Sequence, residues 1–288
     1  MKRLIVNADD FGLHPLINEG ILESHQQGIV TSTSLLASGD YFEDALSLAK
    51  TMPTLGVGLH VCLVGGLSPV CDPKEIPSLL IDGKFPMTHT EFIKRLYIGR
   101  IKGSELRKEI EAQFQKVMST GLPITHVDGH QHMHVLPQVL PIVAEQMKRY
   151  GLTKIRMPDE TPFLINGVSS LGRWIGKVGL TVITQQAYTT SRDFGFSSPL
   201  YFWGMMNGGH LKEEPLLAIL KNVAKKQGVH EIMTHPGKDN HTLQSLYDWG
   251  YHWDEERAAM TSARVKEYIA THDISLIHYG QWTEGDHS

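Results

Sequence analysis

The sequence has few cysteines, no long apolar run and little charge imbalance. Its 288 residues include two cysteines, Cys62 and Cys71, which form no C-x-x-C pair and no disulfide framework, so we expect a reducing, cytoplasmic setting. No stretch approaches the roughly 18 uncharged apolar residues of a membrane-spanning helix. The formal net charge is -4 and the pI about 6.5, which gives no basic surface for nucleic acid or anionic membranes.

The first residues, MKRLIVNADDFG, begin as a signal peptide would, with two basic residues before an apolar run. The run is limited to Leu4–Val6, because Asn7, Asp9 and Asp10 interrupt it. That is too short for the apolar region of a signal peptide, so we expect none.

Short β-branched runs alternate with amphipathic stretches along the whole chain. This alternation predicts βαβ units, a mainly parallel sheet, and a (β/α) barrel-like fold of seven to nine units in a single domain over 1–288. A doubly wound open sheet is the alternative that periodicity leaves open. The predicted strands are Leu4–Ala8, Val30–Ala37, Gly56–Leu63, Ile124–Asp128, Lys154–Met157, Leu180–Gln185, Leu200–Trp203, Glu231–Thr234 and Ile274–His278. The predicted helices are Pro15–Gln27, Asp40–Lys50, Ser104–Thr120, Pro137–Tyr150, Lys212–Gln227 and Asp254–His272.

Polar clusters follow four of the predicted strands. They are Asn7–Asp10, His60, the string HVDGHQHMH at 126–134, and THPG at 234–237. Carboxyl ends of parallel strands share one face of an α/β fold, so we expect the clusters to converge there. The Gly- and Pro-rich segment Gly65–Pro86 reads as a long loop on that face, and it would shape a substrate cleft.

The histidine string offers more ligands than one site needs. If 126–134 were all strand, five polar side chains would share one face, which a packed interior does not accommodate. We therefore expect the strand to end near Gly129, with His130 at the mouth and His126 deeper as a hydrogen-bonded core residue. His132 and His134 then lie on the following loop, before Pro137.

Convergent His and Asp side chains suit a divalent cation. Two histidines and a carboxylate leave coordination positions open for water and substrate. Each piece alone has an ordinary structural explanation, because an isolated histidine such as His60 is more often structural and an Asp-Asp pair also occurs in turns and helix caps. The string at 126–134 is the signal that favours a metal or catalytic role. Four tryptophans are candidates for stacking on a sugar ring, although a core role is commoner for each: Trp174, Trp203, Trp249 and Trp253.

At these residues the sequence resembles the YdjC-like family, which includes chitooligosaccharide deacetylase. The matching segments cover nearly the whole chain in family order: IVNADDFG at 5–12, GIVTSTSLL at 28–36, VGLH at 57–60, THVDGHQHMHVLPQV at 125–139, IRMP at 155–158 and THPG at 234–237. The stretches FWGMMNGGH at 202–210 and TSARV at 261–265 look closer to the hopanoid-biosynthesis deacetylase branch, which implies an N-acetylglucosaminyl lipid as substrate.

The resemblance implies a barrel-like fold and metal-dependent removal of N-acetyl groups from sugars. Carried over by motif, it makes Asp10, His60 and His130 the ligands of one divalent cation, Mg²⁺ or Zn²⁺, and Asp9 the base. His235 of THPG is our choice for the acid that protonates the leaving amine, and His132 or His134 is the next candidate.

Two other functions stay open at the level of sequence. A different metal hydrolase, such as an amidohydrolase or phosphoesterase, would need a two-metal centre, for which Asp128, His132 and His134 are available. A non-catalytic sugar-binding protein would not need Asp9, so the intact Asp9–Asp10 pair argues against it. The sequence also leaves open the sugar, its attachment to a lipid, and the oligomeric state, a homodimer included.

Overall fold

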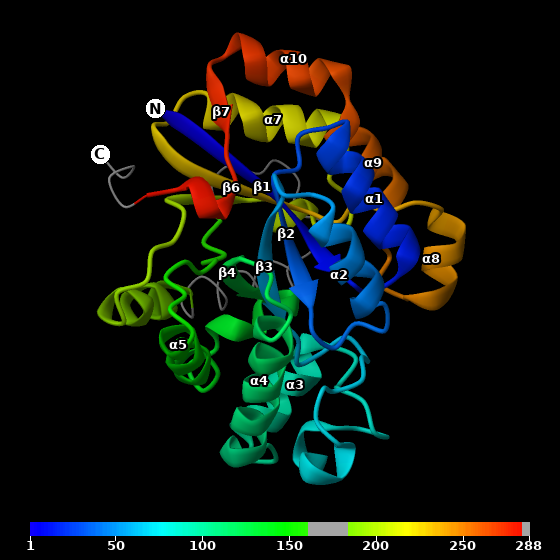
Figure 1. The fold of residues 1–288 in the computed structure, drawn as a ribbon, viewed down its shortest axis with the longest axis vertical. Coiled ribbons are helices and arrows are strands. Elements are labelled where there is room, and N and C mark those ends of the chain that lie inside the picture. The colour runs from blue at the N-terminus through cyan, green and yellow to red at the C-terminus, as the bar shows by residue number, and fades with distance from the viewer. Residues whose placement is uncertain (161–183, 284–288) are drawn as a thin grey trace.

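A computed structural model describes residues 1–160 and 184–283. Its sheet contains seven strands, all of them parallel to their neighbours. Figure 1 shows these strands in the middle of the molecule with helices around them. The strands are β1 (Lys2–Phe11), β2 (Ser32–Leu36), β3 (Gly56–Val61), β4 (Ile124–Gly129), β5 (Tyr201–Trp203), β6 (Gly228–Thr234) and β7 (Ile274–Leu276).

The strand order decides between the two predicted architectures. The order β4-β3-β2-β1-β6-β5 follows the chain around a circle, with no reversal of the kind found in a doubly wound sheet. Isolated parallel bridges join Val127 to Ile155 and Lys154 to Ser197, so the predicted strand Lys154–Met157 lies in the gap between β4 and β5 as single bridges. The predicted barrel-like α/β fold is therefore confirmed.

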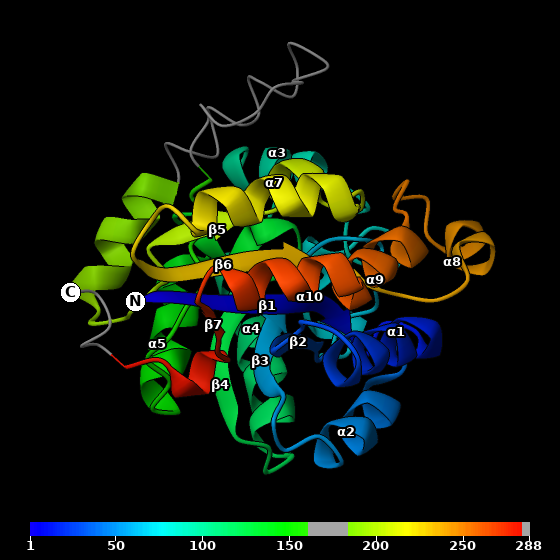
Figure 2. The ribbon, with the colours of Figure 1, turned by 90° about the horizontal axis from the view of Figure 1, so that it is seen from above.

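Strand β1 lies at the centre of this arrangement. Along one edge it pairs with β6 from Lys2 to Ala8, and Figure 2 shows the two strands running side by side. Its other edge is shared, because β7 pairs with Lys2–Leu4 and β2 pairs from Asn7 onward. The side chains of Leu4, Val6 and Ala8 belong to the main hydrophobic core.

The helices cover the outside of the sheet. They are α1 (Pro15–Gln26), α2 (Phe42–Lys50), α3 (His89–Tyr97), α4 (Gly103–Met118), α5 (Leu140–Arg149), α7 (Glu213–Val223), α8 (Asn240–Leu246), α9 (Trp253–Thr261) and α10 (Ala263–Thr271). The short 3-10 helices are η1 (Pro73–Glu75), η2 (Pro77–Leu79), η3 (His130–Val135), η5 (Met205–Asn207) and η6 (Tyr279–Gln281). None of the described helices has both the length and the apolar character that a membrane crossing requires.

Two predicted elements are wrong in detail. The helix predicted over Asp254–His272 is two helices, because Ser262 has an extended ψ of 129° and its side chain accepts from Val265 N to begin α10. The predicted strand Leu180–Gln185 lies outside the described residues up to 183, and residues 184–193 form a helix. Helices α3 and α8 had no counterpart in the prediction.

The loop predicted at Gly65–Pro86 is present, between β3 and α3. Gly65 N donates to Pro86 O at 2.9 Å, so the two ends of the loop meet. Gly65 lies in the left-handed region with φ +90°, where a Cβ would lie 2.8 Å from His130 Nε2. The loop therefore reaches the same edge of the sheet as the histidine string.

Candidate active site

Two adjacent aspartates near the end of β1 leave the regular strand geometry. The pairing of β1 with β2 shifts register between Ala8 and Phe11. Asp10 has a φ of 67°, a left-handed conformation that side chains other than glycine adopt mainly at turns and functional sites. This irregularity removes the strict alternation of a strand, so Asp9 and Asp10 can both serve the same site.

Asp10 lies beside His60, near the end of β3, and His130, the first residue after β4. His130 Nδ1 is 2.9 Å from Asp10 Oδ1, and His60 Nε2 is 3.6 Å from the same oxygen. All three side chains are buried. One possible ligand atom from each lies within 4.8 Å of those from the other two, a spacing that a single metal ion can bridge. The sequence expectation that these three converge is met.

Asp128 fixes the ring of His60. His60 Nδ1 lies 2.7 Å from Asp128 Oδ1, and an ionised carboxylate only accepts hydrogen bonds, so the proton is on Nδ1. The lone pair of His60 is then on Nε2, the atom that faces Asp10. A carboxylate behind a histidine is the usual arrangement of metal-binding histidines. Burial opposes protonation of His60, but the charge and hydrogen bond of Asp128 raise its pKa.

Several polar atoms of this cluster have no hydrogen-bond partner. They are both carboxylate oxygens of Asp10 and Nε2 of His130, all buried. The approach of His130 Nδ1 to Asp10 is close but lacks hydrogen-bond geometry. Burial opposes ionisation of Asp10, yet His130 and His60 hold its pKa well below the usual range. A buried, ionised and unpartnered carboxylate costs free energy unless a cation satisfies it, so the three residues fit a metal ion.

Asp9 is held by a buried arginine. Arg156 donates from Nη1 to Asp9 Oδ2 at 2.6 Å and from Nη2 to Asp9 Oδ1 at 2.7 Å. Asn7 Nδ2 also donates to Asp9 Oδ1, at 2.8 Å. Each carboxylate oxygen accepts two hydrogen bonds, so among the described contacts Asp9 keeps one free position, on Oδ2. The geometry fixes the orientation of Asp9 and leaves one lone pair available.

The same arginine contacts two further carboxylates. Its Nη1 lies 2.8 Å from Asp128 Oδ2, and its Nε donates to Glu231 Oε1 at 2.8 Å. Burial disfavours the charged guanidinium, but the charges of Asp128, Asp9 and Glu231 raise its pKa further above the ordinary value. Burial raises the pKa of Glu231 to about 7, against the opposing effect of Arg156.

A second set of three ligand atoms, from Asp9, His60 and Asp128, has a spacing suited to a metal. In this set Arg156 already neutralises Asp9 and Asp128, and Asp128 accepts the His60 proton. A second cation there would have to displace a guanidinium that is fully buried. A cation at this second set therefore has to compete with Arg156 for both carboxylates.

The end of β4 and the place of His126 agree with the prediction, but His132 and His134 lie in the 3-10 helix η3 and not on a loop. Strand β4 ends at Gly129, and His126 lies deeper, stacked on Tyr279 at 3.8 Å, with burial lowering its pKa to about 3. His134 Nε2 donates to the carbonyl of Arg156 at 2.9 Å, so it supports the arginine segment. His132 is buried against Phe202, and burial holds its pKa well below the ordinary value.

His235 follows β6 and is paired with a buried glutamate. Its backbone N donates to Glu256 Oε2 at 2.5 Å, and its Nδ1 is 3.8 Å from the same oxygen. Burial opposes protonation, but Glu256 outweighs it and the pKa of His235 rises to about 9. The charges of Asp9 and Asp10 also raise the pKa of His235.

Sequence reasoning missed the residues that hold the others in place. Arg156 and Glu256 are buried ion-pair partners that no local pattern of polar residues marks. The available signal for Arg156 was a charged residue inside the otherwise apolar segment IRMP. Glu256 offered no comparable signal, because it lies on helix α9 among other acidic residues.

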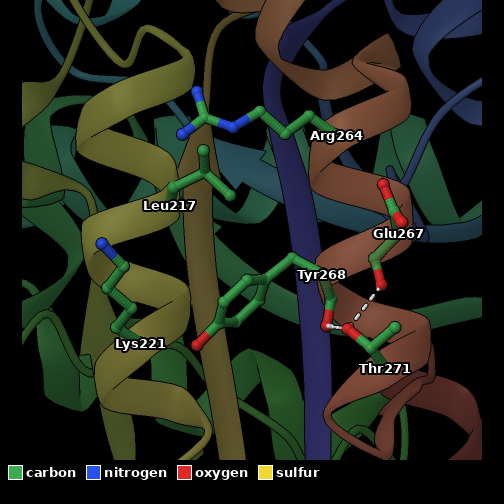
Figure 3. A pocket seen from close by; sticks show the side chains of 6 residues that line it. All are labelled: Leu217, Lys221, Arg264, Glu267, Tyr268 and Thr271. Atoms are coloured by element: carbon green, nitrogen blue, oxygen red, sulfur yellow. Dashed lines mark hydrogen bonds between the residues drawn. The ribbon is translucent and has the colours of Figure 1, made fainter.

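A cleft of about 220 Å³ between α7 and α10 lies elsewhere (Figure 3). Its lining includes Lys221, Arg264 and Tyr268, and Arg264 is already paired with Glu213 and Glu214. Helix α10 leads into β7, which pairs with the first residues of β1. The cleft therefore lies toward the amino ends of the strands, whereas Asp10 lies at the carboxyl end of β1. It has no part in the His/Asp cluster.

A circular order of parallel strands, with a buried His/Asp cluster at their carboxyl ends, defines a barrel-like α/β protein with a candidate metal centre. The model of the family described as YdjC-like protein matches residues 3–271, and the chain belongs to this family.

Named relatives extend the comparison over nearly the whole chain. A carbohydrate deacetylase of Brevibacillus brevis is 32% identical over 280 residues, covering 97% of this chain and 99% of the relative. A chitooligosaccharide deacetylase of Salmonella paratyphi B is 33% identical over 270 residues, covering 93% and 94%. The crystal structure of an Enterococcus faecalis protein, described as a candidate for cellobiose-phosphate cleavage, matches with a TM-score of 0.77 and 28% identity, covering 96% and 97%.

Proposed function

We propose that this protein is a metal-dependent deacetylase that removes the N-acetyl group from an amino sugar in an oligosaccharide or glycolipid. The single observation that carries the proposal is the buried cluster of Asp10, His60 and His130, whose carboxylate has no hydrogen-bond partner. Relatives of similar length that are named carbohydrate deacetylases support the substrate class.

Asp10, His60 and His130 would hold one divalent cation, Mg²⁺ or Zn²⁺. When bound, such a cation lowers the pKa of a coordinated water and polarises the acetyl carbonyl. Asp128 keeps the His60 proton on Nδ1, so that Nε2 stays free as a ligand. Asp10 remains ionised in the buried site, which the ligand role requires.

Asp9 would take the proton of the attacking water. Arg156 and Asn7 occupy three of its acceptor positions, and the free position on Oδ2 is the one available to a water. The two hydrogen bonds from Arg156 prevent rotation of the carboxylate, so this position is fixed in space. A carboxylate that is held in one orientation and keeps a free acceptor position is what general base catalysis needs.

His235 would protonate the leaving amine. An amine is expelled poorly as an anion, so an acid must supply a proton as the C–N bond breaks. Glu256 raises the pKa of His235 to about 9 against the effect of burial, so the ring carries its proton at neutral pH. Asp9 as base and His235 as acid then complete a hydrolysis between them.

The test is acetate release from N-acetylglucosamine oligomers and from an N-acetylglucosaminyl lipid, with and without chelator. We expect release that stops with chelator and returns with Mg²⁺ or Zn²⁺, at one ion per chain. Two tightly bound ions would favour a two-metal hydrolase instead. Binding of the sugar without any acetate release would indicate a non-catalytic sugar-binding protein.

The acid role of His235 has its own test, which compares leaving groups. His235→Ala should strongly slow the hydrolysis of an N-acetyl sugar, whose amine needs the proton. It should slow the hydrolysis of an activated aryl acetate much less, because a phenolate leaves unaided. Equal losses on both substrates, with metal content and folding unchanged, would remove His235 from the acid role and bring forward His132 or His134.

A further inference from the structure

Three aromatic residues at alternate positions lie between α8 and α9, beside the candidate site. We call Tyr247, Trp249 and Tyr251 the aromatic band. Ring centroids are 5.1 Å apart between Tyr247 and Trp249 and 5.7 Å between Trp249 and Tyr251, so the three rings form a continuous row. The segment carries no strand or helix, and its three rings pack against the main hydrophobic core.

The aromatic band contacts both a proposed metal ligand and the proposed acid. The Trp249 ring is 5.1 Å from the ring of His130, one of the proposed metal ligands. The Tyr251 ring is 4.8 Å from the ring of His235, the proposed acid. A group placed against the band therefore lies next to both the carbonyl and the amine side of the bond to be cleaved.

Among the tryptophans of the described residues, Trp249 differs from those that fill the core. Trp203 and Trp253 are 4% and 0% exposed and pack in the interior. Trp249 is only partly buried, and its Cζ2 lies 3.6 Å from the position a Cβ on Gly65 would take. Because Gly65 has no side chain, the loop backbone passes close to both the ring edge of Trp249 and His130 Nε2. A large apolar ring kept partly at the surface beside polar catalytic groups is typical of a ligand site.

We propose that Trp249 is the stacking platform for the sugar ring that carries the acetamido group. A pyranose ring has an apolar face of C–H bonds, and aromatic rings bind such faces while hydroxyls at the edge stay hydrated. Stacking on Trp249 places the ring substituent next to His130 and directs the nitrogen toward His235. Trp249 thus acts on binding and orientation of the sugar and takes no part in proton transfer. This inference rests on the proposed function.

The experiment compares Trp249→Ala and Trp249→Phe with the unaltered protein on two substrates. The first substrate is the β-1,4-linked dimer of N-acetylglucosamine, and the second is 4-nitrophenyl acetate, which has no sugar to stack. For Trp249→Ala we expect KM for the dimer to rise roughly tenfold, with the aryl acetate rate changed less than about twofold. Trp249→Phe keeps an aromatic face and should recover most of the affinity.

Tyr268→Ala is the matched control. Tyr268 is also partly buried and stacks on a histidine, His272, at 3.8 Å, but it lines the α7–α10 cleft of Figure 3. Its loss should leave KM for the dimer unchanged. A rise in KM with Tyr268→Ala and none with Trp249→Ala would overturn the proposal and move sugar binding to that cleft.

Tryptophan fluorescence supplies a measurement that does not depend on turnover. Addition of the dimer should change the tryptophan emission of the chelator-treated, unaltered protein. Trp249→Phe should not show this change, although its KM for the dimer should stay low. An equal loss of activity on both substrates in Trp249→Ala would show that the ring only supports His130, and this result would overturn the proposal. Absence of acetate release from the unaltered protein would refute the proposed function itself and, with it, this inference.

Discussion

Arg156 binds Asp9 through two parallel hydrogen bonds, Nη1 to Oδ2 at 2.6 Å and Nη2 to Oδ1 at 2.7 Å. Both side chains are buried, and the same guanidinium also contacts Asp128, whose other oxygen accepts the proton of His60. The Arg156 guanidinium therefore positions the proposed base Asp9 directly. It positions the proposed metal ligand His60 indirectly, through the carboxylate of Asp128. Each of these links can be broken separately.

Arg156→Met should destabilise the protein by about 3–5 kcal/mol, because it leaves buried carboxylates without their counter-charge. Unfolding in urea measures the change. Arg264→Met is the matched control, since Arg264 pairs with Glu213 and Glu214 at the surface and its loss should change the free energy of unfolding far less. Similar losses in the two variants would contradict the buried network.

Asp10→Asn and Asp9→Asn should fail in different ways. Asparagine tolerates the left-handed backbone of residue 10, so the fold should persist while metal affinity falls. Asp9→Asn should keep the metal and lose turnover by about 10²–10⁴-fold, because it removes the proton acceptor together with one of the two hydrogen bonds from Arg156. Metal content by elemental analysis, with kcat on the same samples, separates the two. Equal metal loss in both variants would mean that the roles are shared or reversed.

Gly65→Ala should weaken metal binding at least about tenfold, because its Cβ would lie 2.8 Å from His130 Nε2 and force that ring to move. Calorimetric titration of the metal-free protein with Zn²⁺ measures this. Gly83→Ala is the control, with a similar φ of +81° and no neighbour within 4 Å of its Cβ. Both variants place an alanine at a positive φ, so an identical metal affinity in the two would show that His130 does not depend on Gly65.

Glu256→Gln should shift the alkaline loss of activity to lower pH. In the unaltered protein Glu256 raises the pKa of His235 to about 9 against burial, so the acid is lost only as pH rises through that value. The raised pKa also stabilises the folded state fully below pH 6.5, and this stabilisation disappears as pH rises toward 9. Profiles of kcat/KM and of thermal unfolding against pH check both effects. Glu255→Gln, at the neighbouring half-buried carboxylate, should leave both profiles unchanged.

The fold class and the convergence of the polar clusters were predictable because both follow from local rules. Alternation of β-branched runs with amphipathic helices predicts parallel strands, and parallel strands bring their carboxyl ends to one edge. Packing density alone indicated that β4 ends near Gly129, which places His130 and His126 correctly. The catalytic and ligand roles of these residues remain predictions that the experiments above test.

The supporting residues could not be predicted because they act over long distances in sequence. Arg156 reaches Asp9 and Glu231, and Glu256 reaches His235, through pairings that exist only once the barrel forms. The break between α9 and α10 was also missed, since Ser262 is compatible with a continuous helix until its side chain caps the second one. Tertiary contacts decide such positions.

The pairing of β1 has a consequence for how the chain acquires its structure. Val6 pairs with Ile232, and Leu4 pairs with Leu276. The central strand β1 therefore cannot complete its pairing until the last segments of the chain have been synthesised. During synthesis one edge of β1 has no strand to pair with, which invites association with other chains. Contacts of such large sequence separation also slow folding. We therefore expect the barrel to form after translation of β7, and the nascent chain to depend on chaperones more than a helical protein of equal size.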